Sequence, residues 1–329
     1  MYKYNNMPNN FKAIAKNIQE IILDNPKIPG EKLKWIKISN AGKKEIEFLR
    51  KKYDFNLNHL RASSAKSIAQ RPSISQGDNY LFLILHFPIF NAGQILAGEI
   101  DFFISQDYLI TLSTENIDAL NKFFNLCKKE GDSLLSYRFE SAAVLLYELL
   151  KKLMADCFTM LDKISIDITN VEDLIFEQKQ KTAVASILSL RRNIINFRRI
   201  MQNHKNILKK LLGMESGIVP SENIKEYYKE LIDYSKTIWE ILDNQKEIID
   251  VLNDTNESLM NYRLNDIMKT LTIFSVIVFP LTLLAAIFGM NTINGMPFIN
   301  SINGFWMVII IMLFGSLGML IFFKKKKWL

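Results

Sequence analysis

The chain has 329 residues, of which 49% are hydrophobic and 23% are charged, and its formal net charge is +7. Acidic and basic residues are interleaved rather than grouped in blocks, which argues against a nucleic-acid-binding protein. The sequence shows no glycine-rich phosphate loop and no catalytic set of serine, histidine and aspartate, so we expect neither an enzyme nor an organic cofactor. Its two cysteines, Cys127 and Cys157, lack the spacing of a metal site and are predicted to be buried, reduced thiols.

Residues 1–130 are predicted to form an α/β domain. His59 and His86 stand alone in it, without a nearby cysteine or second histidine, and are expected to have structural roles. Apolar alternation, apolar runs and helical spacing identify its elements. The predicted strands are residues 32–39, 80–90, 99–105 and 108–114, and the predicted helices are residues 43–52 and 116–129.

Residues 131–220 are predicted to form a helical hairpin. Its helical content is expected to begin at residue 133, and its two main stretches are residues 139–176 and 181–212. The link between these stretches is polar and short, which favours an antiparallel pair of helices.

Residues 221–270 are predicted to form a stalk helix. After Ser221, a good N-cap, no glycine or proline occurs before Pro280, so one helix could extend from residue 221 to residue 290. Two heptad rows predict that the stalk packs against other helices. The first row is Leu231, Ile238, Gln245, Leu252 and Leu259, and the second is Tyr234, Ile241, Ile248, Thr255 and Tyr262.

Two uncharged apolar runs, residues 271–290 and 305–323, follow the stalk. At ~1.5 Å per helical residue, each is long enough to cross the ~30 Å hydrocarbon core of a bilayer. A short external loop, residues 291–304, joins them into a transmembrane hairpin whose ends share one side of the membrane. A basic tail, residues 324–329, follows the second run, and Lys269 precedes the first. The positive-inside rule therefore predicts an integral protein of the cytoplasmic (inner) membrane with both termini in the cytoplasm.

The first apolar run is not uniform, because polar or small residues recur along it at heptad spacing. Such a stripe inside a membrane faces either a neighbouring helix or water. One span cannot enclose a water column, so a wet stripe requires several copies of the chain around an axis. One row is Asp254, Asn261, Met268, Ser275, Thr282 and Gly289, and its companion is Ser258, Asn265, Thr272, Phe279 and Ala286.

The outer end of this stripe carries Gly289-Met290-Asn291. A Gly-Met-Asn tripeptide that closes the first of two C-terminal spans is similar to the signature of the CorA family of divalent-cation transporters. The resemblance is close over about residues 220–329 and looser upstream. The residues that agree with it are Met268-Lys269-Thr270-Leu271-Thr272, Phe279-Pro280-Leu281-Thr282, Met296-Pro297 and the lysine-rich tail.

The resemblance implies an α+β cytoplasmic domain followed by a long helical stalk and a two-helix transmembrane hairpin, assembled as a funnel-shaped homopentamer in the lipid bilayer. Its first span would line a pore that carries Mg²⁺, with Co²⁺ or Ni²⁺ as further cargo, into the cytoplasm down the electrochemical gradient. Gly289, Met290 and Asn291 would form the selectivity filter. The resemblance places Asn265, Met268, Thr272, Phe279 and Thr282 at or near the pore surface.

The resemblance also implies regulation from inside the cell. In the family, cytoplasmic Mg²⁺ bridges subunits through carboxylates and holds the pore shut. Alignment on the tripeptide without gaps carries these acidic positions to Glu230, with Asp233 one turn further along, and to Asp254. The resemblance further suggests a basic collar at the cytoplasmic end of the pore, formed by Lys324, Lys325, Lys326 and Lys327.

The sequence departs from the family pattern at two places. Gln70-Arg71-Pro72 resembles a family motif, but the acidic residues that usually stand several positions upstream are missing from residues 59–65. The outer loop also lacks the acid that commonly follows Met-Pro, so cation capture would depend on asparagine side chains and carbonyl oxygens.

Two other functions stay open. The chain could be a Zn²⁺ transporter of the same family, or a membrane-anchored coiled-coil scaffold that conducts nothing. The polar stripe of the first span discriminates between a channel and a scaffold, because a mere anchor does not need it.

Overall fold

The structure is a computed structural model that describes residues 11–25, 28, 30–65, 70–128, 139–214, 222–291, 297–298 and 301–328. The predicted helical residues 133–138, the predicted N-cap Ser221 and Met296 of the loop motif lie outside this part of the chain. The chain divides into two compact units, Met1–Leu252 and Asn253–Leu329.

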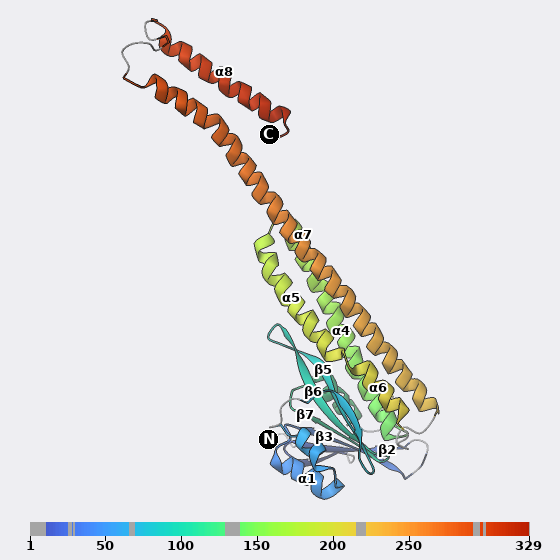
Figure 1. Cartoon of the computed structure of the whole chain (residues 1–329). Helices are drawn as coiled ribbons and strands as arrows, with labels where there is room; N and C mark the ends of the chain where they lie inside the picture. Colours follow the sequence, from blue (N-terminus) through green and yellow to red (C-terminus); the bar gives the residue numbers. More distant parts are fainter. Residues whose placement is uncertain are drawn as a thin grey trace, which may run out of the picture. The chain divides into compact units, whose positions relative to one another are not determined.

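Within the described residues, the first unit contains a seven-stranded sheet in the order β1-β2-β3-β7-β6-β5-β4 (Figure 1). Neighbouring strands are antiparallel except β3 and β7, which run parallel with Ile36 opposite Ile110. The four strands predicted from the sequence are confirmed as β3, β5, β6 and β7, whereas β1, β2 and β4 were not predicted. The strands are β1 (Phe11–Ala15), β2 (Ile18–Asp24), β3 (Lys32–Ser39), β4 (Ser73–Gln76), β5 (Leu81–Asn91), β6 (Gln94–Ile104) and β7 (Tyr108–Ser113).

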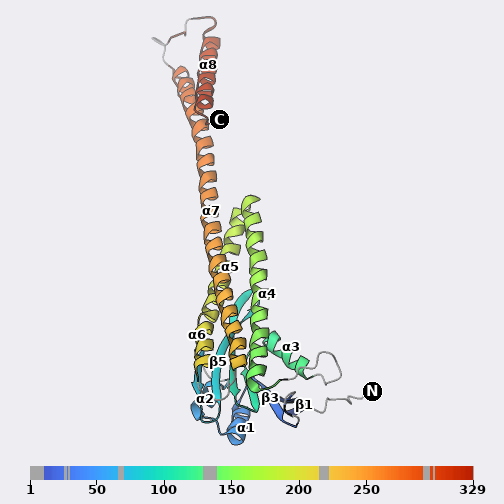
Figure 2. The same ribbon diagram turned by 90° about the vertical axis from the view of Figure 1, so that its right-hand side faces the viewer.

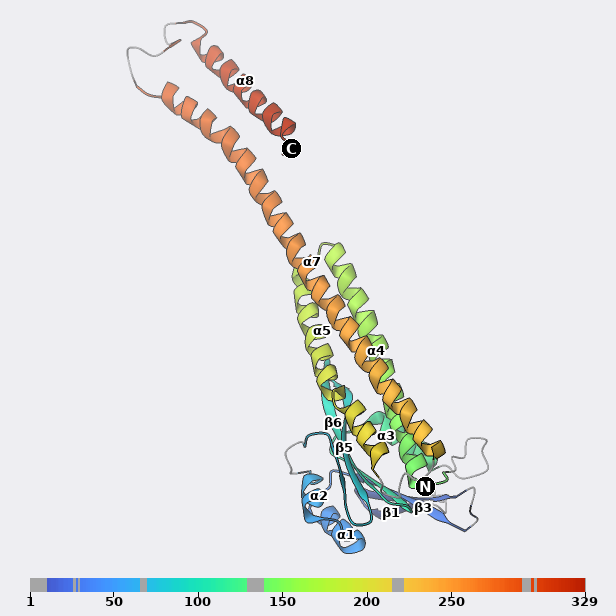
Figure 3. The same cartoon turned by 45° about the vertical axis from the view of Figure 1, so that its right-hand side comes forward.

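Helices cover both faces of the sheet, because the central strands are apolar on both sides (Figure 3). On one face, Ile36 and Ile38 of β3 join a buried cluster with Leu49 and Leu60, which belong to the two short helices. On the other face, Trp35 lies 4.9 Å from Phe124, ring centroid to ring centroid. The first face carries α1 (Lys43–Tyr53) and α2 (Leu57–Ala62), and the second carries α3 (Asp118–Cys127) and α4 (Ala142–Phe176).

The predicted helical hairpin is confirmed, with one correction. Helix α4 is followed by α5 (Gln180–Met201) and α6 (His204–Gly213), so the return is two helices rather than the single helix predicted for residues 181–212. The two parts pack on different strands, α5 on β5 and β6 and α6 on β4, which explains a break that no local residue signals. Figure 2 shows α4 beside α5 and the first part of α7 (Glu222–Phe288).

Hydrogen bonds join α7 to the hairpin within the first unit. Tyr228 Oη donates to the Ala143 carbonyl at 2.8 Å, and Gln245 Nε2 donates to the Leu161 carbonyl at 2.9 Å. The first heptad row is confirmed as far as Leu252, because its members up to that residue are buried. The second row is only partly covered in the single chain, where Ile248 is 40% exposed, so its packing stays a prediction. The buried companion row is Tyr228, Ser235, Leu242 and Ile249.

The two predicted thiols are confirmed, because Cys127 and Cys157 are both buried and free. His59 also has the structural role expected of it. Its ring nitrogens lie 2.8 Å from Tyr80 Oη and 3.0 Å from Ser75 Oγ, and its ring stacks on Phe82.

The second unit contains the end of α7 and all of α8 (Gly304–Lys325). Among the described residues, these are the two helices that are long and apolar enough to cross a membrane. Helix α7 includes Pro280 without ending there, and it stops at Phe288. The two predicted membrane runs therefore lie on these helices, and the Gly289-Met290-Asn291 tripeptide follows directly after α7.

Candidate functional site

The second unit leaves most of its part of α7 uncovered, including large apolar residues such as Leu264, Ile267 and Phe274. Ile273 is buried, and Val278, Leu281 and Leu284 are half-buried, so these residues mark the covered side. The residues expected along the ion path are all exposed, Met268 to 59% and Phe279 to 70%. The single chain thus presents these uncharged, partly polar residues outward, together with much of the rest of this part of the helix. That exposed set is Asn265, Met268, Thr272, Phe279 and Thr282.

The two threonine hydroxyls of this stripe donate hydrogen bonds to backbone carbonyls of the same helix. Thr272 Oγ1 donates to the Met268 carbonyl at 2.7 Å, and Thr282 Oγ1 donates to the Val278 carbonyl at 2.9 Å. A hydroxyl that donates inward keeps its lone pairs for an outside partner. Both side chains can therefore accept a hydrogen bond from the water shell of a cation while offering it no competing proton.

Pro280 adds another acceptor to the same region. Proline has no N–H, so the carbonyl four residues earlier, that of Val276, loses its partner within the helix. Val276 is exposed and lies between Thr272 and Phe279 along the helix. A carbonyl oxygen of this kind must be satisfied by water, a neighbouring chain or a ligand.

Gly289 closes the helix at the expected filter. Its amide donates to the carbonyls of Ala285 at 2.9 Å and Ala286 at 3.2 Å. A Cβ at this position would lie 3.2 Å from the Ala285 carbonyl oxygen, which is tighter than ordinary side-chain contacts. Met290 and Asn291 follow as exposed, non-helical residues. The tripeptide therefore leaves its backbone and one amide side chain open at the end of the stripe.

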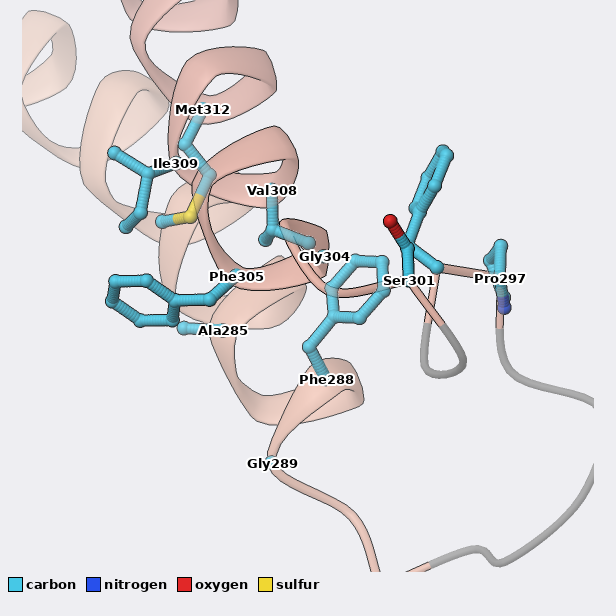
Figure 4. A pocket seen from close by; sticks show the side chains of 11 residues that line it. Ala285, Phe288, Gly289, Pro297, Ser301, Gly304, Phe305, Val308, Ile309 and Met312 are labelled. Atoms are coloured by element: carbon cyan, nitrogen blue, oxygen red, sulfur yellow. The ribbon is translucent and has the colours of Figure 1, made fainter.

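An apolar cavity of about 490 Å³ lies between the end of α7 and the start of α8. Figure 4 shows Phe288 and Phe305 among its lining side chains, with Gly304 at the start of α8. A Cβ on Gly304 would meet the Phe298 carbonyl oxygen at 2.2 Å, a distance that no side chain tolerates. Sequence reasoning missed this glycine, whose only signal was its place at the head of the second run.

The basic tail folds against the base of the hairpin. Lys269 Nζ donates to the Lys327 carbonyl at 3.2 Å, and the Trp328 ring stacks on Phe323 at 5.8 Å. Because Lys269 follows Met268, this bond places the tail beside the predicted cytoplasmic end of the exposed stripe. The first tail lysines occupy the last turn of α8, where positive charge is favourable. The exposed lysines are Lys324, Lys325, Lys326 and Lys327.

Glu230, predicted to hold a regulatory cation, is engaged within its own chain. Tyr147 Oη donates to one carboxylate oxygen, and Tyr234 Oη and Lys151 Nζ approach the other at 2.5 and 2.9 Å. The hydrogen bonds from Tyr147, then Tyr234 and Lys151, lower the pKa of Glu230 to about 2. The structure thus surrounds Glu230 with phenols and an amine rather than with other acids.

Asp233 and Asp254 are both exposed on α7. At ~1.5 Å per helical residue, Glu230 and Asp254 are roughly 36 Å apart along that helix. In the described part of the chain, no three histidine, cysteine, aspartate or glutamate side chains are grouped so that they could hold a metal ion. A shared cation at these acids would therefore need carboxylates from more than one chain.

A comparison with known protein families identifies the family of this chain. A family model described as "CorA-like Mg2+ transporter protein" matches residues 30–325. The chain belongs to this family. The resemblance carried by Gly289-Met290-Asn291 is thereby confirmed, and the chain is a CorA-like divalent-cation transporter with two apolar C-terminal helices.

Individual relatives agree with the CorA assignment. The cobalt/magnesium transport protein CorA of Thermotoga maritima is 25% identical over 297 residues, covering 90% of this chain and 83% of the relative. The complete structure of the CorA magnesium transporter from Methanocaldococcus jannaschii matches with a TM-score of 0.80 at 19% identity, covering 96% of this chain and all of that one. The ZntB cytoplasmic domain from Vibrio parahaemolyticus matches with a TM-score of 0.55 at 16% identity, covering 70% of this chain and 88% of that one.

Proposed function

We propose that this CorA-like protein is a homopentameric channel of the cytoplasmic membrane that carries Mg²⁺ inward. The observation that supports it best is the exposed, uncharged stripe of α7, which ends at Gly289-Met290-Asn291. Oxygen acceptors line this stripe, and a single chain leaves all of its predicted pore residues uncovered. Several copies around an axis would turn the stripe into a closed, wet path.

The chemistry of the stripe suits a hydrated ion. Mg²⁺ is small and loses its waters slowly, so a filter that stripped the ion bare would conduct poorly. Amide, hydroxyl and carbonyl oxygens can instead accept hydrogen bonds from the waters that surround it. Asn291 and Gly289 would form the filter with Met290, and Asn265, Thr272 and Thr282 would continue the path. Met268 and Phe279 would narrow the path with apolar side chains.

The driving force would be electrical and chemical, because the sequence shows no nucleotide-binding motif. A dication that crosses a potential of 100 mV gains roughly 4.6 kcal/mol, twice the ~2.3 kcal/mol of a single charge. The external loop has no acid, so its neutral oxygens would capture the ion. The lysine collar at residues 324–327 would impose a positive potential where the ion leaves, which salt would screen.

Gating would come from cytoplasmic Mg²⁺ held between subunits by Glu230, Asp233 and Asp254. Within its own chain Glu230 already accepts three hydrogen bonds, so an ion must compete there with Tyr147 and Lys151. Asp233 and Asp254 are exposed and could meet an ion at lower cost. We therefore propose that these two aspartates contribute more to closure than Glu230 does.

A Zn²⁺ transporter of the same family is the second candidate. It is favoured by the likeness of the first unit to the ZntB cytoplasmic domain. A non-conducting scaffold is the third candidate, and the exposed polar stripe argues against it. These candidates differ in what crosses the membrane, so flux measurements separate them.

The test is ion flux into liposomes that contain the purified full-length protein, with Mg²⁺ and Zn²⁺ measured in parallel. We expect Mg²⁺ uptake that an inside-negative potential accelerates. Asn291→Ala should abolish it with assembly retained, because one amide oxygen is lost from every subunit. Asn206→Ala, which changes an exposed asparagine of α6 outside the predicted ion path, is the matched control and should conduct normally. Uptake of Zn²⁺ alone would favour the second candidate, and no uptake of either ion would favour the scaffold.

A further inference from the structure

A polar pocket lies in the α/β part of the first unit, far along the chain from the predicted pore. Its volume is about 260 Å³. Strands β5, β6 and β7 supply its floor, and the segments that follow β3 and α2 supply its rim. The rim is closed by a hydrogen bond from the Ala65 amide to the Ala41 carbonyl at 2.9 Å.

The pocket is acidic. Glu99, Asp101 and Glu115 line it together with His86, and no lysine or arginine is among the described residues that line it. Two of the carboxylates are anchored. The Gln70 amide donates to Glu99 Oε2 at 2.8 Å, His86 Nε2 lies 3.0 Å from the same oxygen, and the Glu99 amide donates to Glu115 Oε2 at 3.3 Å. The anchors hold the acids in place without neutralising all three.

Asp101 is the buried acid of this pocket. Its exposed fraction is 3%, and its Oδ1 atom has no hydrogen-bond partner. A buried, unsatisfied carboxylate oxygen is costly, and it is rarely retained without a ligand, an ion or a structural reason. Burial, and next the charge of Glu99, raise the pKa of Asp101 to about 7, and a hydrogen bond from the Ser63 side chain opposes this shift.

We propose that this pocket binds a hydrated divalent cation, Mg²⁺ in the cell, with Asp101 as its principal acceptor and Glu99 and Glu115 around it. The pocket lies within one chain and uses none of the α7 acids. It is therefore a second cation site, distinct from the subunit-bridging site proposed above.

The ion would keep its water shell. The acids are not grouped closely enough for three of them to ligate one metal directly. A pocket of about 260 Å³ has room for more than a bare ion, and Mg²⁺ usually keeps several of its waters when a protein binds it. Ser63 and Ser113, which also line the pocket, can exchange hydrogen bonds with those waters. The choice of Mg²⁺ rests on the proposed function, whereas the acidic pocket itself does not.

The experiment measures amide hydrogen exchange in the purified full-length protein in lipid nanodiscs, with Mg²⁺ titrated at constant ionic strength. We expect Mg²⁺ to slow exchange at residues 63–65 and 114–115, which line the pocket. Asp101→Asn should shift half-saturation by about tenfold, the usual effect of losing one charge-assisted hydrogen bond. Asp107→Asn is the matched control, because Asp107 is an exposed acid in the adjacent β6–β7 turn.

Cobalt(III) hexammine serves as the second probe, because its ammonia ligands do not exchange and it can bind only through its outer shell. Protection of the same residues by this complex would support binding of the hydrated ion, and protection by Mg²⁺ without it would overturn that reading. The proposal also fails if Mg²⁺ gives the wild-type protein no protection there, or if Asp101→Asn titrates like the wild type.

The pore variant Asn291→Ala keeps the two proposals separate. It should lose flux and retain pocket protection. If the wild-type protein conducts Mg²⁺ but shows no Mg²⁺ protection at the pocket, the pocket inference fails and the proposed function stands.

Discussion

One helix, α7, has different surroundings in the two units of the molecule. In the first unit its apolar stripe is covered by the rest of the chain, and Leu231, Leu242 and Ile249 are fully buried. In the second unit its large apolar side chains are mostly exposed, and Ile273 and Phe323 are the buried hydrophobic residues among those described there. The helix is regular in both units, so local propensity does not explain the difference.

The two units differ in the interactions that stabilise them. The first unit buries apolar area in its own core, as a water-soluble protein must. The second unit leaves that area exposed, and in the proposed channel lipid and other copies of the chain would cover it, because apolar contact with lipid carries no penalty. Its defined structure then depends on close backbone contacts and on hydrogen bonds such as that of Lys269.

A large loss of transport is expected from Gly304→Ala. The new methyl group would meet the Phe298 carbonyl oxygen at 2.2 Å, so Phe298 and the start of α8 cannot keep their present positions. Mg²⁺ flux in liposomes should fall by at least about tenfold, equivalent to ~1.4 kcal/mol or more. Gly315→Ala, in the same helix with no atom within 4 Å of the new methyl group, should conduct normally. Equal behaviour of the two variants would show that the loop is not held by this backbone contact.

The next effect compares one substitution at two places along α7. Leu242→Ala removes a fully buried side chain in the first unit, and it should lower the free energy of unfolding by ~2–5 kcal/mol. Leu264→Ala removes one that is 58% exposed in the second unit, and it should change that energy by less than ~0.5 kcal/mol. Urea titration of both full-length variants in detergent, followed by circular dichroism, gives the two values. A large loss for Leu264→Ala would mean that the second unit also depends on a core.

A third effect tests the core of the first unit through pH. Burial, and next the charge of His86, lower the pKa of His204 to about 4, so it stays neutral in the fold while the unfolded chain takes up a proton near pH ~6.5. Stability is therefore complete above about pH 6.5 and falls as the pH drops towards 4, by about 3 kcal/mol. Unfolding curves for the wild type and His204→Asn across this range measure the effect. The variant should lose that much less, and parallel curves would contradict the assignment.

The smallest effect concerns the surface of the first unit. Glu230 is bonded by Tyr147, Tyr234 and Lys151, which lower its pKa to about 2, so its contribution is present above about pH 4.5 and lost as the pH falls towards 2. Its side chain is 35% exposed, and solvent screening keeps that contribution below ~1 kcal/mol. Tyr147→Phe should lower the melting temperature slightly and shift the Mg²⁺ midpoint of protease protection only slightly, because Asp233 and Asp254 are proposed to contribute more to closure than Glu230. A large shift of the Mg²⁺ midpoint would show that this cluster senses the ion.

Much of the fold was predictable because it depends on local pattern and length. The bounds of β3, the continuity of α7 and the two membrane runs follow from apolar period and from the absence of helix breakers over long stretches. The tripeptide at the end of α7 was also readable, since its meaning depends on its distance along the chain from the two runs.

Periodicity identifies an apolar or polar face, but it does not say what covers that face. For this reason the sequence did not identify the row of α7 that is buried beside the first heptad row, and it missed the break at Gln202 between α5 and α6. It also could not show that Glu230 meets Tyr147, or that Gly304 meets the Phe298 carbonyl, because the packing of separate segments decides those contacts. The acidic pocket has the same origin, since Ser63, Asp101 and Glu115 come from separate elements that only the folded sheet brings together.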